Sequence, residues 1–304
     1  VLLRSLELWR SPDRSQRLFF AQLEAVETVL FLVEGPDDLK QGINVPSDEP
    51  GDDAKAEGYK AFVRYALKMA TGTGKTVVFG MLIAWQTINK VRAPHDKKFA
   101  KRFLIVAPGI TIRDRLRVLR PSDDENYYKM RDLVPVDLWG DLQQAQIAIT
   151  NYHAFLPKVT KEAEGVAAAV KNVLRKKGQP DPFIETPGQV VTRVLKDLGP
   201  DTKEPIIVLN DEAHHCYINK AVESGDGVVK ADSEDRSRND DARVWFLGLQ
   251  WLMKHRNLKG IYDLSATPYF LKGSGYYEGF IFPWTVSDFS LIEAIESGIV
   301  KIPR

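Results

Sequence analysis

A short stretch at positions 69–76, Met-Ala-Thr-Gly-Thr-Gly-Lys-Thr, contains the residues best suited to chemistry in this chain of 304 residues. Apolar residues run before it over 62–67 and after it over 77–85, so the pattern predicts a strand, a glycine-containing loop and a helix. In that context the backbone N–H groups of the loop can surround phosphate groups, and the helix dipole favours bound anions. Lys75 is then expected to reach the β- and γ-phosphates of a nucleotide, and the Thr76 hydroxyl to bind Mg²⁺.

The residues expected to form this phosphate-binding loop are Gly72, Thr73, Gly74, Lys75 and Thr76. One position departs from the G-x-x-x-x-G-K-[ST] pattern, because Met69 stands where the first glycine is usual. The alternative is a glycine- and threonine-rich turn that merely precedes a helix. The flanking strand and helix favour the phosphate-binding interpretation.

Two carboxylates, Asp211 and Glu212, follow another apolar run at 206–209, with Asn210 between the run and the carboxylates. In an open α/β sheet, ligands bind beyond the carboxyl ends of the strands. Beside a phosphate-binding loop, we expect Asp211 to hold Mg²⁺, directly or through water, and Glu212 to orient and activate the attacking water. The alternatives are a pair of solvated carboxylates in a loop, or a zinc site. The zinc ligands would be Asp211, His214, His215 and Cys216, which lie too close in sequence to surround one tetrahedral ion easily.

The elements that must position these residues follow from the apolar pattern. Short, mostly apolar runs predict strands of a parallel sheet at 62–67, 103–107, 147–149 and 206–209. The segment 259–264, which leads into Ser265-Ala266-Thr267-Pro268, is predicted as a fifth strand. Helical periodicity predicts helices at 14–34, 76–90, 111–119, 162–176, 188–198, 244–255 and 288–297. Polar segments rich in Gly, Pro, Ser and Asp predict loops at 35–58 and 222–241.

Bulk properties predict an ordinary globular protein, with 44% hydrophobic and 27% charged residues. The net charge of +1 means that any nucleic-acid-binding surface must be local. A single cysteine, Cys216, excludes an internal disulfide, and no apolar run approaches the roughly 18 residues of a membrane span. We therefore expect a cytoplasmic protein. Because the chain lacks an initiator Met and stops abruptly at Arg304, we also expect a fragment of a longer protein.

Three arginines, Arg113, Arg115 and Arg117, lie among the apolar positions of the helix predicted at 111–119. They are either a solvated helix face or contacts to a phosphate backbone, and the sequence favours neither interpretation.

The predicted strands each end in a short polar motif. In order, the motifs are M-A-T-G-T-G-K-T, A-P-G, T-N-Y-H, D-E-A-H and S-A-T. This order resembles the first RecA-like domain of superfamily 2 helicases and translocases, and His214 completes the DEAH form. The wider pattern, with T-N-Y-H-A-F and D-L-S-A-T-P-Y-F, is similar to the helicase portion of type III restriction enzymes.

The resemblance implies roles for individual residues. Gln22 matches the glutamine that reads adenine upstream of the phosphate loop, with Arg17 and Phe19 flanking the base. The catalytic residues would be Lys75, Asp211 and Glu212, with Thr76 and Asp211 as the Mg²⁺ ligands. The residues that would couple the nucleotide state to a second domain are His214, Ser265 and Thr267. The residues that would touch the backbone of a nucleic-acid strand are Pro108, Gly109, Thr150 and Asn151.

The implied fold is α/β: a RecA-like P-loop domain with a mostly parallel sheet and helices on both faces. Residues 1–60 would carry the adenine-reading motif and an acidic loop, 61–290 the ATP-binding domain, and 291–304 the start of a linker to a second RecA-like domain. The implied cofactors are ATP and Mg²⁺. Because the second domain supplies arginine fingers, worth ~10³–10⁵ in rate, we expect the isolated chain to bind ATP but to hydrolyse it poorly.

The implied function is that of an ATP-dependent DNA helicase or translocase, the motor of a restriction-type enzyme. Its partners would be duplex DNA, contacted through the backbone, the second RecA-like domain and a modification (methyltransferase) subunit, with no membrane. Two alternatives stay open: an RNA helicase, and a nucleotide-switched nucleic-acid-binding module that does not unwind.

Overall fold

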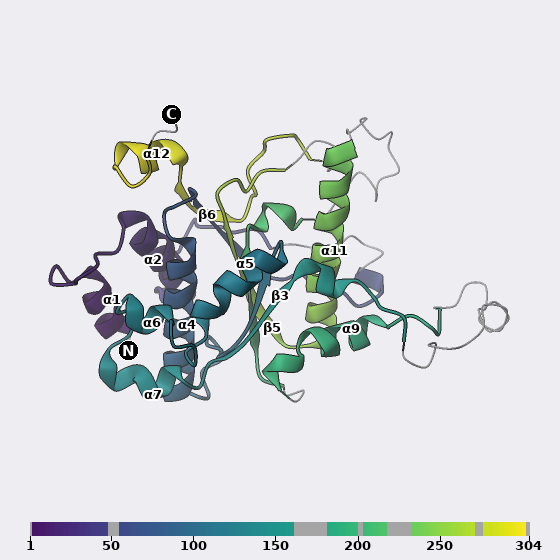
Figure 1. The fold of residues 1–304 in the computed structure, drawn as a ribbon, viewed down its shortest axis with the longest axis horizontal. Helices are drawn as coiled ribbons and strands as arrows, with labels where there is room; N and C mark the ends of the chain where they lie inside the picture. The colour runs from purple at the N-terminus through teal and green to yellow at the C-terminus, as the bar shows by residue number, and fades with distance from the viewer. Residues whose placement is uncertain are drawn as a thin grey trace.

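A computed structural model of the chain describes residues 2–47, 55–160, 181–199, 203–217, 233–270 and 276–301. At its centre is a six-stranded, all-parallel sheet in the order β3-β2-β4-β5-β1-β6 (Figure 1). The strands are β1 (Arg64–Met69), β2 (Arg102–Ala107), β3 (Gln146–Asn151), β4 (Ile206–Asp211), β5 (Leu258–Ser265) and β6 (Thr285–Phe289).

Parallel pairing brings the carboxyl ends of the inner strands to one edge of the sheet. Leu264 of β5 lies opposite Leu67 of β1 on one side and opposite Asp211 of β4 on the other. The segments that follow β1, β4 and β5 therefore emerge next to one another, although they are far apart in the sequence. This edge is where an open α/β sheet binds its ligands.

The sheet is buried on both faces, and β2 shows how its sequence produces this. Phe103 and Ile105 belong to one hydrophobic core, whereas Leu104 and Val106 belong to the other. Alternate residues of a strand point to opposite faces, so a continuous apolar run suits a strand covered on both sides.

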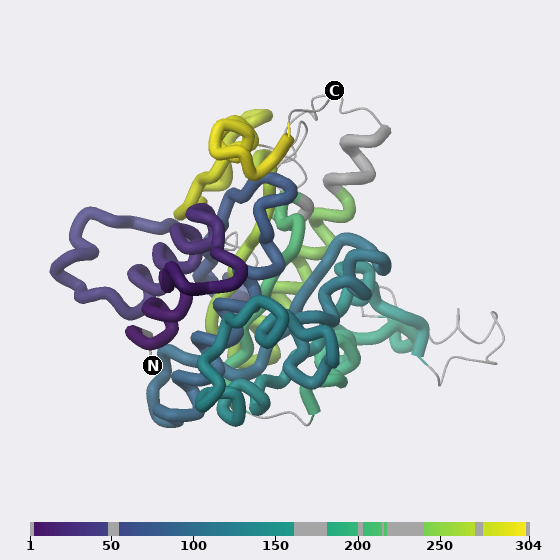
Figure 2. Tube along the Cα trace, turned by 60° about the vertical axis from the view of Figure 1, so that its left-hand side comes forward, coloured from purple at the N-terminus to yellow at the C-terminus, as the bar shows by residue number. Residues whose placement is uncertain are grey.

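Helices cover the two faces (Figure 1). The first face carries α1 (Leu2–Arg10), α2 (Phe20–Glu34), α4 (Lys75–Arg92), α5 (Ile110–Arg115), η1 (Leu116–Leu119), α6 (Tyr127–Met130), η2 (Val136–Leu138), α7 (Trp139–Leu142) and α12 (Leu291–Glu296). The second carries η3 (Tyr152–Phe155), α9 (Pro187–Val194), η5 (Lys196–Leu198) and α11 (Ser233–His255). α2 lies against β6, so early and late parts of the chain meet beside the phosphate-binding loop (Figure 2).

α4 is the helix that presents the phosphate-binding loop. It is buried from Val77 to Ile88, including the side chains of Phe79 and Trp85. A helix that is apolar on nearly all sides belongs in the interior, between the sheet and an outer layer of helices. The rigid packing of α4 therefore fixes the position of the loop that precedes it.

The structure confirms the five predicted strands and the helices predicted at 76–90, 111–119 and 188–198, with ends shifted by a few residues. The second of these is divided between α5 and η1, and the third between α9 and η5. The helix predicted at 162–176 lies outside the described residues. None of the described helices combines the length and apolar character that crossing a membrane requires.

Three predicted boundaries are wrong. The helix predicted from residue 14 begins at Phe20, and α11 begins at Ser233, inside a predicted loop. The first turns of α11 are almost entirely polar, so they carry no apolar period and are helical because they continue a buried helix. The helix predicted at 288–297 is β6 up to Phe289 and α12 from Leu291, because β6 pairs with β1 despite its irregular pattern.

Candidate active site

Two glycines shape the loop between β1 and α4. Gly72 (φ 89°) and Gly74 (φ 86°) both have a left-handed backbone that residues with side chains rarely adopt. A Cβ on Gly74 would also lie 2.1 Å from the amide nitrogen of Gln22. Because α4 begins at Lys75, the loop places Lys75 and Thr76 in the first helical turn, where backbone N–H groups lack helical partners. This is an arrangement suited to binding phosphate groups.

The phosphate-binding loop contacts the segment that follows β4. Lys75 Nζ lies 3.0 Å from Glu212 Oε1, and the two side chains are 11% and 26% exposed. The residues come from strands that are separated in the sheet by β5. The predicted catalytic lysine and the predicted water-activating carboxylate therefore meet at one point of the sheet edge.

Asp211 is buried at the end of β4. Burial, together with the neighbouring Glu212 charge, raises the pKa of Asp211 to about 6, and the Lys75 ammonium opposes this increase. A second cation next to the carboxylate would lower the pKa again, since an opposite charge favours the ionised form. A buried, poorly compensated carboxylate is the kind of group that a bound metal ion stabilises.

The backbone turns sharply after Asp211. Glu212 has φ 53° and ψ 49°, a left-handed conformation that is uncommon for a residue with a long side chain. Such a conformation costs about 1–3 kcal/mol and persists only where the surroundings enforce it. The turn directs the Glu212 side chain towards Lys75 and starts the short helix η6 (Ala213–His215).

The segment after β4 also contacts the end of β5. His214 Nδ1 lies 2.8 Å from Ser265 Oγ, and the backbone N–H of Thr267 donates to the same oxygen at 3.0 Å. Because Ser265 Oγ accepts this hydrogen bond, its own proton can be directed at His214. The motifs D-E-A-H and S-A-T are thus joined by a hydrogen bond, and Glu212 Oε2 lies 3.5 Å from His214 Nδ1.

Comparison with protein families shows which family has this order of motifs. A family model described as type III restriction enzyme, res subunit, matches residues 16–268. The chain belongs to this family. The match includes the phosphate-binding loop and the motifs after β4 and β5, and it establishes a superfamily 2 helicase domain with a RecA-like fold. A search among curated proteins finds no match.

The res-subunit family is that of helicase-like, ATP-binding domains of restriction-type enzymes. Its magnesium site would use few protein ligands, since Mg²⁺ is usually held by one or two carboxylates together with substrate phosphates. Among the described side chains, no three His, Cys, Asp or Glu residues are grouped to hold a metal ion. The oxygens of Thr76 and Asp211, beside a loop shaped for phosphates, are a suitable partial set for Mg²⁺ bound with a nucleotide.

Gln22 lies directly against the phosphate-binding loop in this family member. Its Nε2 donates to the Thr73 carbonyl at 3.0 Å, and its Oε1 accepts from the Phe19 N–H at 2.9 Å. The side chain is only 4% exposed. Gln22 therefore holds the loop in place, and the adenine-reading role that the resemblance implies stays a prediction. Phe19 is partly exposed, and Arg17 donates to the Pro12 carbonyl.

The residues predicted to contact nucleic acid lie at the ends of two neighbouring strands. Thr150 and Asn151 of β3 pair with the last two residues of β2, just before Pro108 and Gly109. The two motifs are therefore side by side at the carboxyl edge of the sheet. The Asn151 side chain also accepts from the Ala154 N–H at 3.2 Å, which gives it a role in starting η3.

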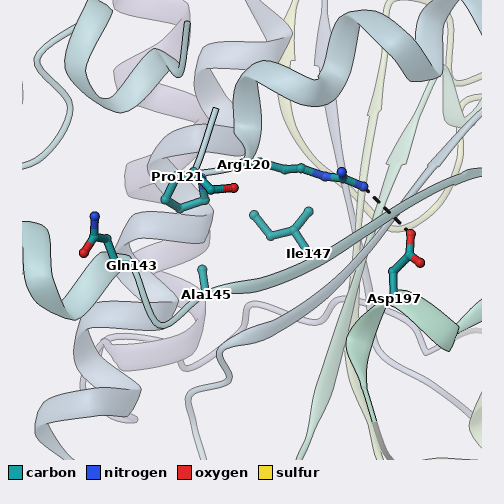
Figure 3. Close-up of a pocket in the computed structure, with 7 residues that line it drawn as sticks. Arg120, Pro121, Gln143, Ala145, Ile147 and Asp197 are labelled. Carbon is teal, nitrogen blue, oxygen red and sulfur yellow. Dashed lines mark ion pairs between the residues drawn. The ribbon is translucent and has the colours of Figure 1, made fainter. Parts of the chain in front are cut away.

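The three arginines after β2 line an open cavity that reaches Thr76. Arg113 pairs with the adjacent Asp114, and Arg117 pairs with Glu125. A neighbouring open pocket lies along β3, where the Arg120 side chain points towards Asp197, 3.9 Å away (Figure 3). The acidic partners offset much of the positive charge, so both interpretations of the arginines stay open.

Three polar residues near the site, Arg64, Asn210 and Asp263, form a buried cluster that sequence reasoning missed. Arg64 and Asp263 pair at 2.7 Å, and Asn210 donates to Asp263 at 2.7 Å. The available signal was Arg64 and Asp263 themselves, charged residues in two of the predicted strands of a buried sheet, where charges are rare unless they are paired.

Replacing Asp211 by asparagine is expected to stabilise the chain at neutral pH without Mg²⁺ or nucleotide. The pKa of Asp211 is raised from 3.8 to about 6, so stability from its neutral form is present below pH 4 and lost as the pH rises through 6. A pKa difference of about two corresponds to roughly 3 kcal/mol, an upper value for the gain at pH 8. Urea unfolding of the parent and the Asp211→Asn variant, at pH 8 and at pH 4 in the presence of EDTA, measures this gain in the free energy of unfolding.

The expected gain at pH 4 is small, because Asp211 is then neutral in the folded protein and no buried charge is left for asparagine to remove. Asp114→Asn is the control, since the Asp114 side chain is 64% exposed. Equal stability of the Asp211→Asn variant and the parent at pH 8 would contradict a destabilising buried charge at this position.

Proposed function

We propose that the chain is the ATP-binding half of a motor that hydrolyses ATP to move on DNA within a restriction-type enzyme. The observation that carries this proposal is the 3.0 Å contact between Lys75 and Glu212. It brings a phosphate-binding lysine and a candidate general base to the same edge of the sheet. The family match supports the helicase-like part of the proposal.

ATP binding would exchange the partner of Lys75. The loop N–H groups and Lys75 would hold the phosphates, and Lys75 would exchange the Glu212 carboxylate for a phosphate oxygen. Glu212, released from Lys75, would then accept a proton from the attacking water. Thr76 and Asp211 would hold Mg²⁺, which would supply positive charge to offset the charge of the phosphates.

The contact between His214 and Ser265 would pass the nucleotide state to the end of β5. Because Glu212 Oε2 lies 3.5 Å from His214, a movement of Glu212 away from Lys75 changes the charge next to that histidine. We propose that Ser265 and Thr267 transmit this change to a second RecA-like domain. That domain would also supply the arginine finger, so the isolated chain would hydrolyse ATP poorly.

The DNA strand would run across the ends of β2 and β3. Pro108, Gly109, Thr150 and Asn151 lie there side by side and would touch the sugar–phosphate backbone. Contacts to the backbone position a nucleic acid without reading its sequence, as a motor requires. A modification subunit would then supply the sequence specificity of the complete enzyme.

The steady-state ATPase rate of the full-length protein, measured with duplex DNA, duplex RNA or neither, tests this proposal. We expect strong stimulation by duplex DNA alone. Stimulation by duplex RNA alone would indicate an RNA helicase, because A-form geometry and 2′-OH contacts differ from those of DNA. Equal ATPase rates in all three conditions would indicate a nucleotide-switched module and would overturn the proposed motor function.

Gln22→Ala separates the two roles of Gln22. If the amide reads adenine, its removal should weaken ATP binding about tenfold more than GTP binding, which corresponds to ~1.4 kcal/mol of lost hydrogen bonding. If the amide only holds the Thr73 carbonyl, both nucleotides should weaken equally. Affinities of fluorescent ATP and GTP analogues measure the ratio, and an unchanged ratio would rule out adenine reading.

A further inference from the structure

A cluster of three buried polar side chains lies beneath the edge of the sheet that binds the phosphates. Arg64, Asn210 and Asp263 come from β1, β4 and β5 and are at most 1% exposed. Arg64 Nη2 and Asp263 Oδ2 are 2.7 Å apart, and Arg64 Nε donates to the same oxygen at 2.8 Å. Asn210 Nδ2 donates to the other carboxylate oxygen at 2.7 Å.

Tryptophan side chains complete the cluster. The Trp284 indole N–H donates to Asp263 at 3.1 Å, and the Trp245 indole N–H donates to the Asn210 oxygen at 3.1 Å. The Arg64 guanidinium also lies over the Trp284 ring, 4.5 Å from its centroid. Each of these contacts fixes a side chain in one orientation, so the cluster is a rigid unit.

A buried ion pair is weak evidence for a role in stability alone. Removing an arginine and an aspartate from water carries a desolvation penalty that their attraction only partly offsets. Burial accordingly raises the pKa of Asp263, and Arg64 and Asn210 oppose the increase. An apolar pair of similar volume often replaces a buried ion pair at no cost in stability.

The cluster instead holds both ends of the segment 211–216. At its start, Asn210 is the residue directly before Asp211, and its amide is tied to Asp263. At its end, Arg64 Nη2 donates to the Cys216 carbonyl at 2.8 Å. A single carboxylate, Asp263, therefore anchors the two points between which the chain makes its strained turn.

We propose that Arg64, Asn210 and Asp263 are positioning residues that hold the 211–216 segment in the geometry needed for Mg²⁺–ATP. The inference rests on the proposed ATP site and adds residues that touch neither nucleotide nor metal. Asp263 lies opposite Asn210 in the sheet register, so the anchor acts one residue from the proposed metal ligand Asp211. Without the anchor, the unfavourable backbone angles at Glu212 would be held only by contacts inside the segment, such as Lys75–Glu212 and His214–Ser265, and both ends of the turn would be freer to relax.

The test is a double variant, Arg64→Met with Asp263→Leu, which replaces the ion pair by apolar side chains of similar size. The affinity for a fluorescent ATP analogue is measured with Mg²⁺ and with EDTA. We expect the Mg²⁺-dependent increase in affinity to fall by about ten- to hundredfold, the usual effect of losing a group that orients a metal ligand. Affinity in EDTA, which depends on the phosphate-binding loop, should change by less than about threefold.

Arg14→Met is the matched control. Arg14 is another buried arginine, and it donates to the carbonyls of Leu8, Arg131 and Asp132, away from the 211–216 segment. Its loss should lower the urea midpoint without changing the ratio of affinities with and without Mg²⁺. If Arg64 and Asp263 only stabilised the fold, the double variant would behave like Arg14→Met. An unchanged ratio of affinities with and without Mg²⁺ in the double variant would therefore overturn the inference.

Asn210→Ala provides a second test that leaves the Arg64–Asp263 pair in place. It should reduce the Mg²⁺-dependent increase in affinity in a protein that unfolds cooperatively in urea, and an unchanged increase would again overturn the inference. Binding of the ATP analogue by the unsubstituted parent chain tests the proposed ATP site separately. If the parent binds no ATP analogue in either buffer, the proposed function fails before the positioning residues are tested.

Discussion

Replacing Lys75 by alanine is expected to weaken Mg²⁺–ATP binding on the order of 100-fold, because truncating one partner of a hydrogen-bonded charge pair costs about 2–5 kcal/mol. The variant also leaves Asp211 and Glu212 without the nearby ammonium, whose charge lowers the pKa of Asp211. The uncompensated carboxylates would then repel the phosphates. Isothermal titration of the chain with a nonhydrolysable ATP analogue measures the loss.

Lys90→Ala is the control for this variant, since Lys90 lies near the other end of α4. Its Nζ donates to the carbonyls of Pro94 and Asp96. Its ATP affinity should equal that of the parent. Equal affinities of Lys75→Ala and the parent would show that the nucleotide does not bind at this loop.

Replacing Glu212 by glutamine is expected to preserve ATP binding and to reduce DNA-stimulated hydrolysis by the full-length protein about 10²–10⁴-fold, the usual contribution of a general base. Glutamine has a similar shape but cannot take a proton from water. It also cannot form an ion pair with Lys75, so the ATP affinity should be equal to or slightly above that of the parent. Single-turnover hydrolysis and equilibrium binding measure the two effects.

Glu7→Gln is the matched control, because Glu7 is an exposed glutamate of α1. Its hydrolysis rate should equal that of the parent. Turnover at the parental rate by Glu212→Gln would exclude Glu212 as the base. A loss of both binding and hydrolysis would indicate that Glu212 supports the site structurally.

The sequence predicts the sheet well because the strands are buried on both faces. A continuous apolar run such as Phe103 to Ala107 has few structural alternatives, and the polar motifs mark where each strand ends. Gly72 and Gly74 are also predictable, since a phosphate-binding loop needs their positive φ angles. The meeting of Lys75 and Glu212 follows from parallel topology, because both follow the carboxyl ends of strands.

Features that depend on tertiary contacts are not visible in local patterns. β6 exists because β1 offers a free edge, while its own sequence, Thr-Val-Ser-Asp-Phe, alternates weakly. The polar start of α11 has no apolar period, so only its buried second half is predictable. The position of Gln22 against Thr73 needs the packing of α2 beside the loop, which no sequence spacing reveals.

The buried cluster of Arg64, Asn210 and Asp263 is another feature that depends on tertiary contacts. The sequence shows charged residues in β1 and in β5, but which charges pair depends on strand order. β5 lies between β1 and β4, so Asp263 can reach both Arg64 and Asn210. Only that order makes one carboxylate the common anchor for the start and the end of the 211–216 segment.

A crystal structure of the chain with Mg²⁺ and a nonhydrolysable ATP analogue tests the central claim most directly. The account predicts phosphates surrounded by the backbone of residues 72–76, with Lys75 Nζ bonded to a phosphate oxygen and no longer paired with Glu212. Asp211 and Thr76 should lie next to the metal ion. A nucleotide bound elsewhere, or phosphates in the loop with Lys75 still bonded to Glu212, would contradict the account.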